Sequence, residues 1–212
     1  MNEVDETIAK LECKLALSVG FFASLSKEDD WSFVIKCHGL MESACSYLLT
    51  AYFDNPTYVD IFSRLEMSDQ KKGKLAFLRA AGLIIPEEAS FIIGLSELRN
   101  TLVHNIHRVA FRFSEHVSSL DKNQQQSFAK SFGYAYLDSD DNDKLILKDS
   151  GPILSDPKSA ILHGLKLVLA IIMLQVETQR FRLDAEEQQK EIYKMVIANN
   201  RLHRIAENVG SR

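Results

Sequence analysis

The chain has 212 residues, of which 46% are hydrophobic and 25% are charged, so it is long and apolar enough for one sizeable core. Its formal net charge of −4 excludes a global basic field of the kind that holds nucleic acid without selection. Any contact with nucleic acid must therefore come from a local group of Arg, Lys and His.

The N-terminal half has the period of amphipathic helices. The first helix is expected over Asn2 to Ser24, and Asp29 or Asp30 is expected to cap a second over Trp31 to Phe53. Asp54-Asn55-Pro56 should end that helix, because proline cannot continue the hydrogen-bond ladder. The further elements expected in this half are a short helix at Thr57–Leu65, a helix capped by Ser68 or Asp69 and ending near Ala81, a C-cap at Gly82, and a helix with Pro86 in its first turn.

The middle of the chain is less regular. Ser118 to Lys130 is polar and is expected to be helical, and the segments Phe132–Leu137 and Lys144–Lys148 flank an acidic turn, which indicates a small β-hairpin. The acidic turn favours a solvated loop over a calcium site, because the glycine and the closing glutamate of an EF-hand are missing at the required offsets.

Asp156 and Pro157 should open a long helix that reaches Asn208 with a break. Its first half is apolar on every side and should be central to the fold. Its second half has a narrow stripe suited to pairing with another helix, in this subunit or a partner. The stripe comprises Phe181, Ala185, Gln188, Ile192, Met195, Asn199 and Leu202.

The expected fold is thus an all-α bundle of about five to seven helices with a long C-terminal helix and a small β-hairpin. We predict one helical domain over residues 1–212, with a motif region at 31–113 and a C-terminal helical segment at 156–208.

The cysteines and the N-terminus bear on the compartment. Cys13, Cys37 and Cys45 are odd in number and form no CxxC pair, so neither a disulfide framework nor a zinc site is expected. Cys37 and Cys45 are eight residues apart and are interpreted as small core residues on one helix face. The start of the chain is unlike a signal peptide, and the longest apolar run, Ile161–Val176, is shorter than a membrane span requires. The expectation is a soluble cytoplasmic protein without a membrane partner.

The helix after Pro86 carries the most informative residues. Leu98-Arg99-Asn100-Thr101-Leu102-Val103-His104 sets an arginine, an amide and an imidazole around one helix edge, and an Arg-Asn pair with His at this spacing is expected only about 0.01 times by chance. Arg99 could bind two phosphate oxygens and His104 could exchange a proton near neutral pH. The structural alternatives are an ion pair at Arg99 and a hydrogen-bonded boundary histidine at His104.

These residues resemble the motif of the HEPN superfamily, an Arg followed by a polar residue and then by His. From Trp31 to His107 the order of elements also resembles that superfamily, with an earlier helix that bears an acid and a later helix that bears the motif. The motif is similar to that of the mannitol-operon repressor branch as well. The region after Phe113 resembles no family. The resemblance implies a metal-independent endoribonuclease that acts without cofactors as a toxin or phage-defence effector. Arg99 and His104 would be the catalytic pair and Asn100 an orienting group.

The resemblance also implies an acidic partner on the earlier helix. Glu42 is the candidate, with His38 one turn before it, and Glu12 and Glu97 are rival acids. His107, Arg108 and Arg112 are candidates for an RNA-binding rim.

Partners and regulation follow from the same likeness. The expected partners are an RNA substrate, a second copy whose motif helix faces the first across a two-fold axis, and an antitoxin or regulatory protein. Ile106 stands where related toxins often have Tyr, which argues against silencing by nucleotide transfer to that position. The alternatives are a non-catalytic regulatory or adaptor protein, like the repressor branch, and a nucleotide-binding sensor.

Overall fold

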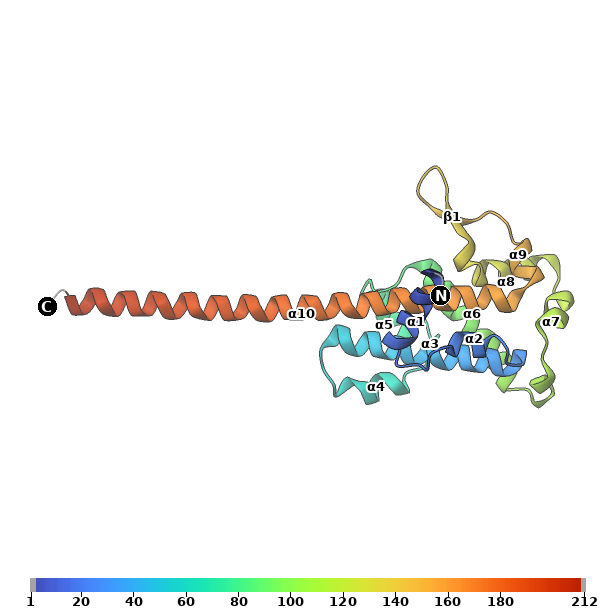
Figure 1. The fold of residues 1–212 in the computed structure, drawn as a ribbon, viewed down its shortest axis with the longest axis horizontal. Helices are drawn as coiled ribbons and strands as arrows, with labels where there is room; N and C mark the ends of the chain where they lie inside the picture. Colours follow the sequence, from blue (N-terminus) through green and yellow to red (C-terminus); the bar gives the residue numbers. More distant parts are fainter. Residues whose placement is uncertain (1–2, 211–212) are drawn as a thin grey trace.

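The computed structural model describes the backbone of residues 3–210 and the side chains of residues 6–105 and 108–197. It confirms an all-α bundle with a small two-stranded hairpin and a long C-terminal helix, which extends far beyond the bundle (Figure 1). The described chain has ten α-helices rather than five to seven, because five of them are segments of only five to seven residues.

The first expected helix is divided in two, so the prediction of one helix over Asn2 to Ser24 is wrong. Helix α1 covers Glu3–Lys14 and α2 covers Phe21–Leu25. Between them Ala16 and Gly20 have positive φ angles of 53° and 82°, which no continuous α-helix allows. The side chain of Glu12 holds the turn, since its two oxygens accept the backbone N–H groups of Gly20 at 2.7 Å and Phe22 at 2.9 Å.

Helix α3, Asp30–Phe53, forms where the sequence predicts it. Asp29 is its N-cap and accepts the N–H of Ser32 at 2.9 Å. Asp54 ends the helix in the left-handed region with a φ of 46°. Helix α4, Tyr58–Arg64, follows directly and confirms the expected short helix.

Helix α5, Lys74–Ala80, begins later than expected. Asp69 does not cap it, because the Asp69 carboxylate accepts the N–H groups of Lys71 and Lys72 in a separate turn. The helix ends as predicted: Gly82 has a φ of 67°, and the N–H of Leu83 reaches back to the carbonyl of Leu78 at 2.9 Å.

Helix α6, Pro86–Val103, carries the motif and packs against α3 as expected. Pro86 stands at the start of the helix, and the Glu88 carboxylate accepts the N–H of the N-cap residue Ile85 at 2.9 Å, which is one of the two hydrogen bonds of a capping box. The other Glu88 oxygen accepts the hydroxyl of Tyr134 at 3.0 Å, which ties α6 to the segment before the hairpin.

The middle of the chain contacts α6 through η1, α8 and η2. Strands Leu137–Ser139 and Leu145–Leu147 pair antiparallel and confirm the predicted hairpin, while Asp140 in its turn accepts the N–H groups of Asn142 and Lys144. The elements here are the 3₁₀-helix η1 (Ile106–Ala110), α7 (Phe113–Ser119), α8 (Lys122–Phe132), the 3₁₀-helix η2 (Tyr134–Tyr136), β1 (Leu137–Ser139), β2 (Leu145–Leu147) and α9 (Gly151–Ser155).

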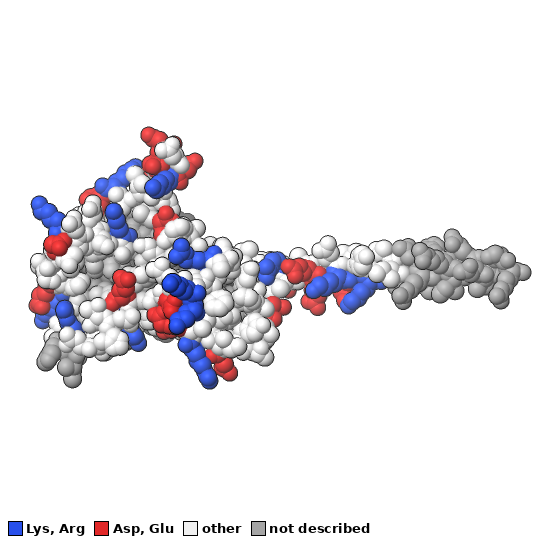
Figure 2. Space-filling view, turned by 180° about the vertical axis from the view of Figure 1, so that it is seen from behind, with Lys and Arg blue, Asp and Glu red and all other residues white. Residues whose placement is uncertain are grey.

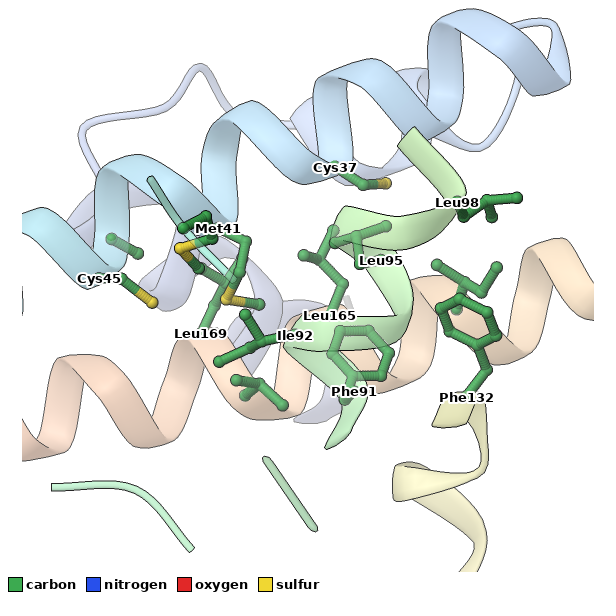
Figure 3. Packing of buried hydrophobic residues seen from close by; sticks show 14 of the residues in the cluster. Cys37, Met41, Cys45, Phe91, Ile92, Leu95, Leu98, Phe132, Leu165 and Leu169 are labelled. Atoms are coloured by element: carbon green, nitrogen blue, oxygen red, sulfur yellow. The ribbon is translucent and has the colours of Figure 1, made fainter. Parts of the chain in front are cut away.

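Helix α10, Pro157–Gly210, is continuous, so the expected break is absent from the described helix. Its first half is central as predicted and packs directly against α3, and Phe91 and Leu95 of α6 lie beside Leu165 of α10 in the same core (Figure 3). Cys37 and Cys45 are buried in this core, which confirms their interpretation as core residues.

Helix α10 is also the one described helix that is long and apolar enough to cross a membrane. More than half of its most apolar stretch, 56%, is buried inside the bundle, where it packs chiefly against α3. On the face shown in Figure 2 basic and acidic residues are interspersed, and both signs occur along the projecting part of α10.

Candidate functional site

Arg99 lies at the edge of the core, one turn before the end of α6. Its neighbours Leu98 and Leu102 are buried, whereas Arg99 itself is half-buried. Its Nη1 donates to Oδ1 of Asn100 at 3.0 Å. Among the side chains described, none of the carboxylates comes within 4.0 Å of the Arg99 guanidinium. The alternative of a structural ion pair at Arg99 is therefore not observed within these residues.

Glu42 is held by a lysine and not by the motif arginine. Oε1 of Glu42 lies 2.7 Å from Nζ of Lys74, and the Lys74 side chain is completely buried. The ammonium also donates to the carbonyls of Leu65 at 2.7 Å and Ser63 at 3.4 Å, so all three of its protons have acceptors. Glu42 remains a candidate acid near the motif, with a direct partner that the sequence analysis did not name.

Lys74 left a signal in the sequence that was missed. It lies four residues before the buried Leu78, so it occupies the apolar face of α5. A lysine on an apolar helix face needs a buried acceptor, because a charge is costly to bury without a partner.

His38 lies beside Glu42 on α3, one turn earlier in the helix. It is buried, and its Nδ1 lies 3.9 Å from Oε2 of Glu42. Burial lowers the pKa of His38; Glu42 counteracts this, and the positive charges of Arg99 and Lys74 lower the pKa further. The charge of Arg99 thus acts on the pair on α3. We call His38, Glu42, Lys74 and Arg99 the polar cluster.

His104 faces solvent at the end of the motif helix. It is exposed, and it is the C-cap residue of α6, with its backbone N–H directed to the carbonyl of Asn100 at 3.3 Å. Five residues separate it from Arg99, so the two side chains leave the helix about 140° apart. Within the described part of the chain, no hydrogen bond or ion pair joins the side chains of Arg99 and His104.

The rival acids occupy other positions. Both oxygens of Glu12 are used by the turn between α1 and α2, as described above. Glu97 is exposed on the motif helix and lines a cavity of about 240 Å³ between α6, α7 and α8, together with His116 and Ser131. Neither Arg99 nor His104 lines this cavity. The motif residues therefore lie outside this hollow.

The expected basic rim follows the motif in the chain. Arg108 and Arg112 are exposed, and Arg112 is 3.8 Å from Glu115 in a surface pair. The pKa of His116 is lowered by burial and by the charge of Arg108. The side chains of Ile106 and His107 lie outside the described residues.

Over the residues whose positions are described, no group of three or more His, Cys, Asp or Glu side chains is placed to hold a metal ion.

No family model, curated protein or solved structure matches this chain.

Proposed function

We propose that the chain is a HEPN-type endoribonuclease that works in the cytoplasm without a metal ion, as a toxin or phage-defence effector. The supporting observation is the state of Arg99: a half-buried guanidinium that is oriented by an amide and has no carboxylate partner among the described side chains. The nearby cation Lys74, in contrast, is neutralised by Glu42. An arginine in this state keeps donors for phosphate oxygens, which a structural ion pair would occupy.

The chemistry assigns one role to each motif residue. A base removes the proton of a ribose 2′-OH, and the resulting oxygen attacks the adjacent phosphorus. The bond from phosphorus to the 5′ oxygen breaks, and that oxygen takes a proton. His104 performs one of these proton transfers, Arg99 stabilises the negative phosphorane, and Asn100 orients Arg99. The products are a 2′,3′-cyclic phosphate and a 5′-OH, and DNA is no substrate because it lacks the 2′-OH.

Two copies of the chain are needed in this proposal. A single helix does not aim Arg99 and His104 at one phosphate, because they diverge by about 140°. A two-fold pair of motif helices would bring His104 of each copy toward Arg99 of the other. Arg108 and Arg112 of both copies would then add positive charge where RNA enters.

Cleavage of RNA in EDTA tests the proposal. Wild-type protein should yield cyclic phosphate ends, and Arg99→Ala and His104→Ala should each be inactive. The matched controls are Arg79→Ala and His163→Ala, which remove exposed residues from α5 and α10 and should retain activity. Activity that requires Mg²⁺, or that survives the Arg99→Ala and His104→Ala double substitution, would exclude this function.

Mixed dimers test the shared site. Arg99→Ala and His104→Ala chains, once mixed, should regain part of the activity because one composite site then has an intact pair. If cleavage activity does not return although the subunits are shown to exchange, the result would count against an active site shared between two copies.

The projecting half of α10 favours a second function, that of a non-catalytic regulatory or adaptor protein. Every described residue from Asp184 to Ile197 is exposed, so this segment is available to a partner such as an antitoxin or a regulatory protein. Expression in cells separates the two functions. A toxin should arrest growth and lose that effect in His104→Ala, whereas an adaptor should be harmless in both forms.

A further inference from the structure

Helix α10 has two opposite faces with different surroundings. One face packs in the core through Ile172, Val176 and the buried Gln179. The other face is open to solvent although it carries large apolar side chains, and it continues along the part of the helix that leaves the bundle (Figure 1). Large apolar side chains exposed along a helix in this way mark an interaction surface.

The open face has a seven-residue repeat. Its members follow one another in alternating steps of four and three residues over three heptads, which is the 3.5-residue period of a two-stranded coiled coil and not the 3.6-residue period of a straight helix. We call this row the seam. It comprises Leu174, Thr178, Phe181, Ala185, Gln188, Ile192 and Met195.

The seam residues are exposed in the described chain. Leu174 is 58% exposed, Phe181 73%, Ile192 58% and Met195 62%. The distance from Leu174 to Met195 along the helix is about 32 Å at 1.5 Å per residue. The remaining members of the stripe expected from the sequence, Asn199 and Leu202, lie outside the described side chains.

We propose that the seams of two copies of this chain pair in a parallel, in-register, two-stranded coiled coil. The proposal stands apart from the ribonuclease function, because it concerns neither the motif nor the polar cluster. In this arrangement each seam residue meets the same residue of the other copy. Gln188 then pairs with Gln188, whereas a shifted register would bury its amide against an apolar side chain.

The charges that flank the seam favour the parallel arrangement. In a parallel pair each flanking residue meets the residue five positions later in the other copy, so Asp184 meets Gln189 and Glu191 meets Val196. Glu177 would meet Arg182, but within one chain Glu177 already pairs with Lys14 and Arg182 donates to the carbonyl of Tyr52. No two acidic side chains meet in this arrangement. An antiparallel pair centred between residues 185 and 192 would instead set Asp184 or Glu191 beside an acidic residue of the other copy.

Disulfide crosslinking of the full chain tests this pairing directly. Gln188→Cys in a Cys13→Ser background places one accessible thiol in the seam, because Cys37 and Cys45 are buried. Oxidation should convert most of the protein to a crosslinked dimer at micromolar concentration. Lys190→Cys, two residues away on the outer side of the helix, is the matched control and should crosslink at least tenfold more slowly. This readout reports contact between α10 helices whether or not the motif helices also pair.

Two lysine substitutions test whether the seam itself makes the contact. Ile192→Lys should abolish the crosslink at position 188 by placing a charge inside the seam. Tyr193→Lys adds the same charge at a residue that is 68% exposed but outside the seam, and it should leave the crosslink intact. Sedimentation of the wild-type chain should show self-association.

Three outcomes would overturn the proposal. They are equal crosslinking at positions 188 and 190, loss of the crosslink in Tyr193→Lys as well as in Ile192→Lys, and crosslinking only between Gln188→Cys and Ala185→Cys chains. The last result would identify an antiparallel pair.

Discussion

Lys74 of α5 and Glu42 of α3 form an ion pair across 2.7 Å, and the lysine in that pair is completely buried. The pair fixes the short helix α5 to the longest helix of the N-terminal half. Glu42 is thus the counter-ion of Lys74 and not of Arg99. Among the described residues of the polar cluster, Arg99 is the cation that has no carboxylate partner.

Removing one member of this pair should destabilise the fold. Glu42→Ala leaves the buried Lys74 ammonium without its anion, and we expect a loss of about 3 kcal/mol in the free energy of unfolding, at the low end for buried pairs because Glu42 is partly exposed. Urea denaturation measures the change. Lys14→Ala breaks the equally short but more exposed pair with Glu177 and should cost less than about 1 kcal/mol. Equal losses in the two variants would contradict this account.

Acid should destabilise the protein through His38. Burial holds its pKa in the folded chain below the ordinary value of 6.5. Below pH 6.5 the unfolded chain binds a proton that the folded chain does not, so stability falls as the pH drops from 6.5 to the lower folded pKa, and then levels off. His38→Gln should reduce the dependence of Tm on pH between 7.5 and 5, and His116, whose pKa is also lowered by burial, should supply part of the slope that remains. His163→Gln, at an exposed position, should retain the wild-type slope. A slope unchanged in His38→Gln would show that other groups carry the effect.

Two helix glycines should respond in opposite directions to alanine. A Cβ at Gly164 would lie 2.5 Å from the ring of Phe91, so Gly164→Ala should cost about 1–3 kcal/mol by overpacking the contact between α6 and α10. Gly39 on α3 has open space around the same position, and Gly39→Ala should stabilise the helix by about 0.5–1 kcal/mol. Thermal denaturation of the two variants measures both changes. Similar stability in both would contradict the packing described here.

Asn100 offers a way to occupy Arg99 without removing it. Asn100→Asp would turn the 3.0 Å hydrogen bond from Arg99 into a charged pair and sequester the guanidinium. If Arg99 binds phosphate, RNA cleavage should fall about tenfold relative to Asn100→Ala, while Tm is maintained or raised. Cleavage rates for both variants decide this. An Asp variant as active as wild type would argue against a phosphate-binding role for Arg99.

The long periodic segments and their caps could be predicted from sequence because their determinants are local. Asp29, Pro86 and Gly82 act within a few residues of their own positions, and each has the expected role. The turn between α1 and α2 could not be predicted, because the apolar residues continue with a helical period through Ala16. The turn is held by hydrogen bonds from backbone N–H groups eight and ten residues later in the chain to the Glu12 carboxylate.

The candidate site was predictable in part for a similar reason. The spacing of Arg99, Asn100 and His104 is a property of one helix, and the approach of α3 follows from its apolar face. The partner of Glu42 depends on where α5 packs, and α5 begins at Lys74, after a separate turn in which Asp69 accepts the N–H groups of Lys71 and Lys72. Tertiary packing brings Lys74 to Glu42, and the sequence near either residue does not predict this ion pair.

The place of α10 in the chain has a consequence for biosynthesis. Helix α10, which covers the apolar faces of α3 and α6, is translated after both of them. Asp30 at the start of α3 therefore pairs with Lys158, 3.1 Å away in the folded chain, only after that later segment has been made. Synthesis from the end of α3 to Val176 takes on the order of ten seconds at about 5–20 residues per second. During that interval the nascent chain presents an uncovered apolar surface, so the ribosome-bound protein is a natural client for chaperones that hold such surfaces apart.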